Sequence, residues 1–121
     1  MASVLIVDDE PLIRWSLGET LEAAGHSVRE AGSAAEALRF FEPGAEPIGA
    51  VVLDLKLPDS SDLGLLRRIR QLAPACRIIL ITAHGTPEVL EEARKSGVSG
   101  VLTKPFDMSC VVPLVDDSAQ A

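Results

Sequence analysis

The sequence is poor in the features that mark several classes of protein. Its two cysteines, Cys76 and Cys110, lack the CxxC or ligand-like spacing of metal and redox sites, so we expect buried free thiols. No apolar run approaches the roughly 18 residues of a membrane span, and no basic-then-apolar leader opens the chain. We therefore expect a cytoplasmic protein with no membrane contact.

Positive charge is also scarce. The chain carries a formal net charge of −7, whereas binding to DNA phosphates needs a basic face. Direct binding of nucleic acid is therefore not expected. The length of 121 residues fits a single domain, over residues 1–121, that is large enough to bury a core without disulfides or structural metals.

Short runs rich in valine, isoleucine and leucine alternate with stretches of helical periodicity. The expected strands cover residues 3–7, 27–31, 50–54, 77–82 and 98–103, of which 27–31 is the weakest and lies nearest an edge. Their continuous apolar character is typical of strands covered on both faces. The pattern (βα)₅ with right-handed crossovers predicts an α/β fold, a doubly wound parallel sheet with helices on both faces.

Local signals place the helix ends. Gly25 ends the first helix, whose apolar stripe consists of Leu12, Ile13, Leu17 and Leu21. Ser33 opens a capping box with Glu36, and Thr86 caps a later helix. The third helix covers about 63–72. The last helix should begin near Asp107 or Ser109, and Pro113 predicts that it is short or kinked.

Polar residues follow four of the five expected strands. Asp8, Asp9 and Glu10 follow the first strand, Asp54 ends the third, Thr82 ends the fourth, and Lys104 follows the fifth. The carboxyl ends of parallel strands share one edge of the sheet, and reactive crevices lie outside that edge. We therefore expect these side chains to converge.

Electrostatics indicates what such a crevice binds. Two carboxylates about 4 Å apart repel by roughly 4 kcal/mol at an effective dielectric constant of 20. A hard divalent cation relieves this repulsion, and Mg²⁺ uses one or two carboxylates while accepting phosphate oxygens. With Lys104 as a second cation and Thr82 as a hydrogen-bond donor, the set predicts phosphoryl transfer to an aspartate.

These residues resemble the receiver domains of two-component response regulators (CheY-like) over about residues 3–112, leaving 113–121 for the last helix and a tail. The motifs are Val7-Asp8-Asp9-Glu10, Asp54-Leu-Lys-Leu-Pro58, Thr82-Ala83 and Lys104-Pro105-Phe106. The resemblance implies a flavodoxin-like fold with strand order 2-1-3-4-5. It also implies a cis peptide bond between Lys104 and Pro105.

The resemblance assigns a role to each matching position. Asp54 would accept the phosphoryl group, Lys104 would pair with it, and Thr82 would move toward it as the switch. The metal ligands would be Asp9, Asp54 and the backbone carbonyl of Lys56, with Asp8 acting through water. The expected ion is Mg²⁺, with Mn²⁺ as an alternative. The chain would be a signalling domain that promotes its own phosphorylation and dephosphorylation rather than an enzyme.

The resemblance also implies partners. A sensor histidine kinase would donate the phosphoryl group. The stretch Ile13-Arg14-Trp15-Ser16-Leu17, with 82–86, looks most like receivers of the nitrogen-regulation (NtrC-type) subfamily of sigma-54 activators. Their receivers precede an ATPase module and a DNA-binding module, neither of which this chain encodes. A homodimer would form through the helix after Thr86, the strand 98–103 and the last helix.

Two positions depart from the family pattern. Asp62 stands where a turn glycine is usual, although aspartate tolerates a left-handed backbone better than most residues. Val101 stands where a tyrosine or phenylalanine commonly swings inward on activation, and the chain has no tyrosine at all. We therefore expect Val101 to alter the switch without affecting phosphorylation.

Three other functions are weighed against this one. A dehalogenase-type phosphatase needs a second aspartate two residues after the nucleophile, where this chain has Lys56. A flavodoxin-like carrier of FMN needs a first loop rich in serine, threonine and glycine, where Asp8 and Asp9 would repel phosphate. A degenerate receiver that only binds partners would lack reactive groups, yet every reactive position is filled.

The remaining polar and aromatic residues favour simpler interpretations. His26 is expected at the surface and Trp15 in helix packing. The cluster Arg67-Arg68-Ile69-Arg70 is expected to be the solvated face of its helix. His84 is expected to be a solvent-exposed loop residue beside the crevice, with modulation of dephosphorylation or a partner contact as the alternative.

Overall fold

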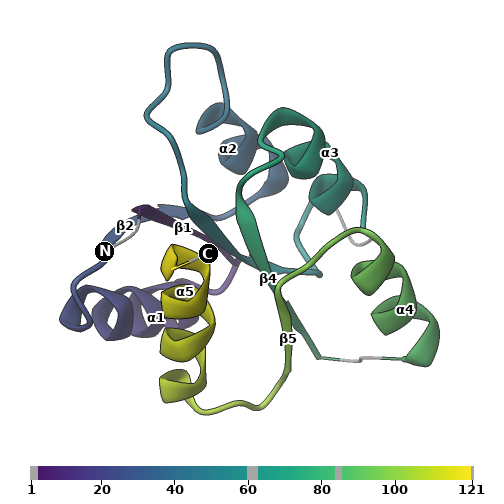
Figure 1. Cartoon of the computed structure of the whole chain (residues 1–121). Helices are drawn as coiled ribbons and strands as arrows, with labels where there is room; N and C mark the ends of the chain where they lie inside the picture. The colour runs from purple at the N-terminus through teal and green to yellow at the C-terminus, as the bar shows by residue number, and fades with distance from the viewer. Residues whose placement is uncertain (1–2, 60–62, 84–85, 121) are drawn as a thin grey trace.

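The computed structural model describes residues 3–59, 63–83 and 86–120, with the side chains of 117–120 left aside. Five parallel strands form one sheet in the order β2-β1-β3-β4-β5 (Figure 1). The strands are β1 (Ser3–Val7), β2 (Ser27–Ala31), β3 (Ala50–Asp54), β4 (Arg77–Thr82) and β5 (Gly100–Thr103). Both the predicted fold class and the predicted strand order are confirmed.

The helices cover both faces of the sheet. They are α1 (Pro11–Ala23), α2 (Ala34–Arg39), α3 (Gly64–Leu72), α4 (Pro87–Lys95) and α5 (Val111–Gln120), with a 3-10 turn over Met108–Cys110. Residues of α1 and α5 share one core cluster, whereas residues of α2, α3 and α4 share the other. Figure 1 shows the resulting three layers.

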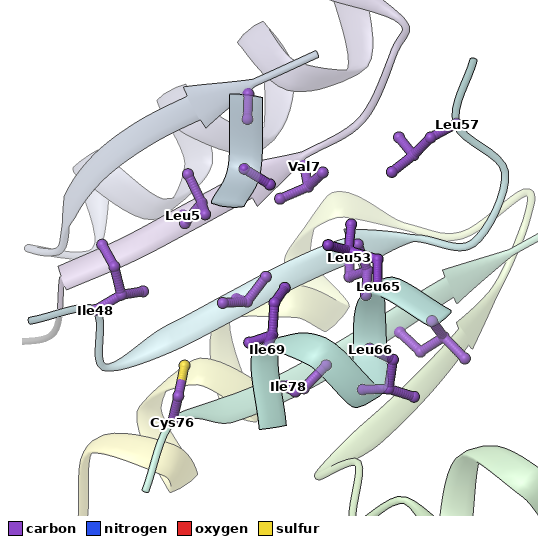
Figure 2. Close-up of a cluster of buried hydrophobic side chains, with 14 of the residues drawn as sticks. Leu5, Val7, Ile48, Leu53, Leu57, Leu65, Leu66, Ile69, Cys76 and Ile78 are labelled. Atoms are coloured by element: carbon purple, nitrogen blue, oxygen red, sulfur yellow. The ribbon is translucent and has the colours of Figure 1, made fainter. Parts of the chain in front are cut away.

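The continuous apolar strands supply both clusters at once. On β1, Leu5 and Val7 face α2 and α3, while Val4 and Ile6 face α1 and α5. The strands β3 and β4 alternate in the same way, because successive side chains of a strand point to opposite faces. Figure 2 shows one of these clusters, with Leu53 and Ile78 beside Leu65, Leu66 and Ile69 of α3, and with Leu5 and Val7 on β1.

The predicted caps and breaks define the helix ends. The Ser33 hydroxyl accepts from Glu36 N at 3.2 Å, and the Thr86 hydroxyl accepts from Val89 N at 3.3 Å. Gly25, with φ +96°, follows α1 in the left-handed region that favours glycine. Pro113 lies in the first turn of α5, where a backbone N–H has no partner within the helix, so the helix accommodates it. At 10 residues α5 is longer than α2, α3 and α4, so the expected shortening is not observed.

Three exposure predictions on α1 and at its end are wrong. His26 is buried, and its Nε2 lies 2.7 Å from Asp116 Oδ1 on α5. Leu12 and Trp15 are instead exposed, with 74% and 60% of their surface accessible. The helix turns Ile13 and Leu17 toward the sheet, which leaves Leu12 and Trp15 on the outer side.

The expectation that the arginine cluster of α3 is only a solvated face is wrong for Arg70. Its guanidinium donates to the carbonyls of Pro74 at 2.9 Å, Cys76 at 2.7 Å and Gly97 at 2.8 Å. Arg67 and Arg68 are exposed, as predicted. Arg70 therefore joins the turn before β4 to the turn after α4.

Both cysteines are free thiols, but only Cys76 is buried, so the prediction is wrong for the exposed Cys110. Burial raises the pKa of the Cys76 thiol to about 11 from its usual 9.0, which lowers the thiolate fraction roughly a hundredfold. We expect iodoacetamide to modify Cys110 first in the native protein, as peptide mass mapping would show. Denaturant should make the modification rates of Cys76 and Cys110 equal. Equal modification rates in the native protein would contradict the burial of Cys76.

Among the described residues, no helix combines the length and apolar character needed to cross a bilayer.

Candidate functional site

Four strand ends meet at one edge of the sheet, as the sequence predicts. Asp8 follows β1, Asp54 ends β3, Thr82 ends β4, and Lys104 follows β5. Lys104 is tied to β4 through its backbone N–H, which donates to the Thr82 carbonyl at 2.8 Å. The crevice is lined by Asp9, Glu10, Asp54, Lys56, Ala83 and Lys104.

Both carboxylate oxygens of Asp54 accept hydrogen bonds within the crevice. Only 3% of its surface is accessible. Its Oδ1 accepts from Lys56 N at 3.1 Å, and its Oδ2 accepts from Lys104 Nζ at 3.2 Å. The carboxylate is therefore held between a loop N–H and an ammonium group, at the bottom of a crevice open to a donor.

Asp8 is nearly inaccessible, at 1%. Its Oδ1 accepts from Glu10 N at 2.8 Å, whereas its buried Oδ2 accepts no hydrogen bond among the described residues and lies 3.9 Å from Lys104 Nζ. Burial raises the pKa of the Asp8 carboxyl to about 6; the Glu10 N–H opposes this, and the Asp54 charge adds to it.

Lys104 is the shared cation of this edge. Its Nζ lies 3.2 Å from Asp54, 3.4 Å from Glu10 and 3.9 Å from Asp8. Burial lowers the pKa of its ammonium group, but Asp54 and Asp8 raise it more, so that the pKa lies above its usual value. Lys104 therefore stays charged and offsets part of the acidic cluster.

The donor set fits a hard divalent cation. Carboxylate oxygens of Asp8, Asp9, Glu10 and Asp54 lie within 4.8 Å of one another. In the described part of the chain, Asp8, Glu10 and Asp54 share Lys104 as their ion-pair partner, and the buried Asp8 Oδ2 lacks a hydrogen-bond donor. Oxygen ligands of this kind suit Mg²⁺. The site therefore has the charge and ligand type for such an ion.

Two residues of the site were missed in the sequence. Glu10, which was grouped with the acidic run but given no role, pairs with Lys104. Asp59 accepts from Ala34 N at 2.8 Å and Ala35 N at 3.0 Å, so it joins the loop after Asp54 to the start of α2. These hydrogen bonds lower the pKa of Asp59. Its place directly after Pro58 was the available signal for a structured turn.

The other predicted residues lie where the sequence placed them or outside the described ranges. Thr82 is buried, at 3%. Val101 is partly buried and packs against the cluster on the α2 and α3 face. The Lys104–Pro105 peptide bond is cis. Asp62 and His84 lie outside the described residues.

We expect Mg²⁺ binding to weaken as the pH falls through about 6, because protonation of Asp8 removes a negative charge from the site. In the metal-free protein the pKa of Asp8 is raised above its usual 3.8, so the folded state binds this proton more tightly than the unfolded chain. That contribution to stability is present at low pH and is lost as the pH rises through about 6.

Calorimetric titration with Mg²⁺ between about pH 5 and about pH 7 checks this dependence. The variant Asp8→Asn should lose most of the pH dependence of Mg²⁺ binding, since the amide does not titrate. A dissociation constant that does not change with pH in the wild-type chain would contradict the prediction.

Comparisons with known proteins agree with this geometry. The family model described as "Response regulator receiver domain" matches residues 4–116. GlrR of Escherichia coli K12, a transcriptional regulatory protein, is 34% identical over 119 residues, which are 98% of this chain and 26% of that protein. The DNA-binding transcriptional regulator NtrC of Azospirillum brasilense is 33% identical over 115 residues, 95% of this chain and 24% of that protein.

Solved structures show the same fold. A response regulator receiver domain protein from Clostridium thermocellum has a TM-score of 0.89 and 30% identity, covering 99% of this chain and 95% of its own. A response regulator from Burkholderia pseudomallei, solved with a phosphorylated aspartic acid, a calcium ion and citrate, has a TM-score of 0.85 and 28% identity, covering 99% of this chain and 70% of its own.

This chain spans about a quarter of the length of these two curated relatives. The predicted resemblance to NtrC-type sigma-54 activators is confirmed, since GlrR and NtrC are of this type. The chain belongs to the receiver domain family of two-component response regulators.

Proposed function

We propose that Asp54 accepts a phosphoryl group from the phosphohistidine of a sensor histidine kinase. The observation that carries the proposal is the buried Asp54 carboxylate, which lies 3.2 Å from the Lys104 ammonium at an edge where three further carboxylates converge. The phosphorylated aspartic acid of the Burkholderia pseudomallei relative supports it. The chain would act as a signalling domain that promotes its own phosphorylation and dephosphorylation.

Asp9, Asp54 and the backbone carbonyl of Lys56 would hold Mg²⁺ directly, with Asp8 acting through water and Mn²⁺ as an alternative ion. Support comes from the clustering of the carboxylates and from the position of Lys56 in the crevice wall. Bound Mg²⁺ supplies positive charge that offsets repulsion between the carboxylate and the phosphoryl oxygens.

The protein's own residues position the reaction. An Asp54 oxygen forms a bond to phosphorus while the bond from phosphorus to the donor's imidazole nitrogen breaks, and its electron pair returns to the imidazole. Lys104 Nζ offsets charge on the phosphoryl oxygens, and Thr82 donates a hydrogen bond to one of them. Both groups already lie at this edge, so the transfer mainly requires positioning.

The new negative charge would draw Thr82 and Lys104 inward and bias the face formed by α4, β5 and α5 between two arrangements. That face would serve a homodimer or an output module with ATPase or DNA-binding activity in a longer protein. With Val101 on β5 in place of an aromatic residue, the movement would not use an aromatic rotamer. A cytoplasmic location is part of this proposal and rests on family membership.

Intact-mass spectrometry tests the proposal directly. Incubation with acetyl phosphate and Mg²⁺ should add one phosphoryl unit to the chain, and prior addition of EDTA should prevent it. Cleavage and peptide analysis should place the unit on Asp54. Labelling of equal extent with EDTA, or labelling of another residue, would overturn the assignment.

A further inference from the structure

The first turn of α1 places an arginine against the backbone of the acidic loop. Arg14 is mostly buried, with 20% of its side chain accessible. Its Nη1 donates to the carbonyl oxygen of Asp8 at 2.5 Å, and its Nε donates to Glu30 on β2 at 3.3 Å. The guanidinium therefore links α1 and β2 to the loop that carries Asp8 and Asp9.

The Asp8 carbonyl belongs to the peptide that joins Asp8 to Asp9. The Asp8 N–H is already fixed, since it donates to the Ala31 carbonyl at 3.1 Å. With its carbonyl held by Arg14, both backbone groups of Asp8 have long-range partners on or beside β2 and α1. The orientation of this peptide decides where the exposed Asp9 carboxylate projects.

Gly32, directly after β2, leaves room for this contact. A Cβ atom built at Gly32 would lie 3.0 Å from Arg14 Nη1 and 3.7 Å from Arg14 Cζ. Gly32 does not have a positive φ, so its backbone conformation does not require glycine. A methyl group at this position would press on the guanidinium, which would have to shift by a few tenths of an ångström.

We propose that Arg14 is a positioning residue for the metal site: its guanidinium, seated over Gly32, holds the Asp8 carbonyl so that Asp8 and Asp9 face the Mg²⁺ position. This inference rests on the proposed function. Arg14 contacts neither the ion nor the phosphoryl group. It acts through a backbone carbonyl, as partners behind metal ligands commonly do, and losing such a partner typically weakens metal binding about 10- to 100-fold.

The direction of the change in Mg²⁺ affinity on replacing Arg14 distinguishes a positioning role from a purely electrostatic one. Removing a positive charge near a cation site strengthens cation binding by Coulomb's law. If Arg14 acted only through its charge, Arg14→Met would bind Mg²⁺ more tightly than the wild-type chain. A positioning role predicts the opposite, weaker binding by about tenfold.

The experiment is a calorimetric titration of Mg²⁺ alone into the purified variants, with thermal unfolding of the metal-free proteins measured alongside. Arg14→Met should raise the Mg²⁺ dissociation constant about tenfold, and Arg14→Lys, which keeps one donor, should recover part of the loss. Glu30→Ala is the matched control, since it removes the ion pair of Arg14 but leaves the Asp8 carbonyl contact. Its dissociation constant should stay within about twofold of wild type.

Gly32→Ala provides an independent arm. In the wild-type chain, the added methyl group should displace the guanidinium and weaken Mg²⁺ binding. In a chain that already carries Arg14→Met, the same substitution should cause no further loss of Mg²⁺ affinity, because the guanidinium is absent. Equal losses in both backgrounds would overturn the role given to Gly32.

Three further outcomes decide the proposal. Unchanged or tighter Mg²⁺ binding by a folded Arg14→Met variant, beside a wild-type chain that binds Mg²⁺, overturns the inference alone. A lower unfolding midpoint with an unchanged dissociation constant identifies Arg14 as merely structural and overturns it as well. Failure of the wild-type chain to bind Mg²⁺ overturns the proposed function, and the inference with it.

Discussion

Replacement of Asp54 by asparagine is expected to abolish phosphorylation of the chain. The amide has almost the size of the carboxylate, and its oxygen can still accept from Lys56 N, which now donates to Asp54 Oδ1 at 3.1 Å. A neutral amide, however, is a far weaker nucleophile than a carboxylate. Intact-mass spectrometry after incubation with acetyl phosphate and Mg²⁺ should show no phosphoryl adduct.

A matched control is Asp107→Asn, which changes an exposed carboxylate while retaining the oxygen that accepts from Ser109 N. This variant should be labelled like the wild-type chain. Circular dichroism should show that Asp54→Asn keeps its fold, because the substitution removes one of four mutually repelling carboxylates. Persistent Mg²⁺-dependent labelling of folded Asp54→Asn would falsify the assignment of the phosphoacceptor.

Replacement of Lys104 by methionine is expected to slow phosphorylation about 10- to 100-fold, because a charge-assisted hydrogen bond is worth roughly 1.5–3 kcal/mol. The ammonium group lies 3.2 Å from Asp54 Oδ2, where it can offset charge on the transferred group. The measurement is the initial rate of phosphoryl incorporation at saturating Mg²⁺.

The same variant should bind Mg²⁺ at least as tightly as the wild-type chain, since a cation beside the site is removed. A slower phosphorylation rate together with equal or tighter Mg²⁺ binding would show that the variant has lost stabilisation of the phosphoryl group. A collapsed site would instead lose both the rate and the Mg²⁺ affinity. Lys95→Met, at the exposed end of α4, is the control and should leave both quantities unchanged. A rate within about twofold of wild type for Lys104→Met would exclude a role in transfer.

The sequence alone predicted the order of elements and the chemical content of the site. Continuous apolar runs indicated buried parallel strands, and the ranges predicted for β3 and β4 match the observed bounds. Once the strands are parallel, their carboxyl ends share an edge, so Asp8, Asp54, Thr82 and Lys104 converge without further information. Phosphorylation of Asp54 itself stays a prediction.

Side-chain exposure was predicted less well. Periodicity placed Leu12 in the apolar stripe of α1, but the helix turns it outward and leaves it 74% accessible. His26 follows a glycine and was expected at the surface, yet packing of α5 over the end of α1 buries it beside Asp116. The exposure of Leu12 and the burial of His26 depend on how the helices rotate and dock against the sheet, which a local sequence pattern does not specify.

What the sequence by itself determined is which groups reach the edge of the sheet. The alternation of strands and helices implies parallel strands, and the residue that follows each strand is read directly from the chain. Only the tertiary structure decided how those groups are held: Lys104 pairs with Glu10, and the Arg14 guanidinium, which lies beside Gly32, donates to the Asp8 carbonyl. These contacts join residues whose separation along the chain has no periodic signature. They form only when helices and loops from different segments pack together.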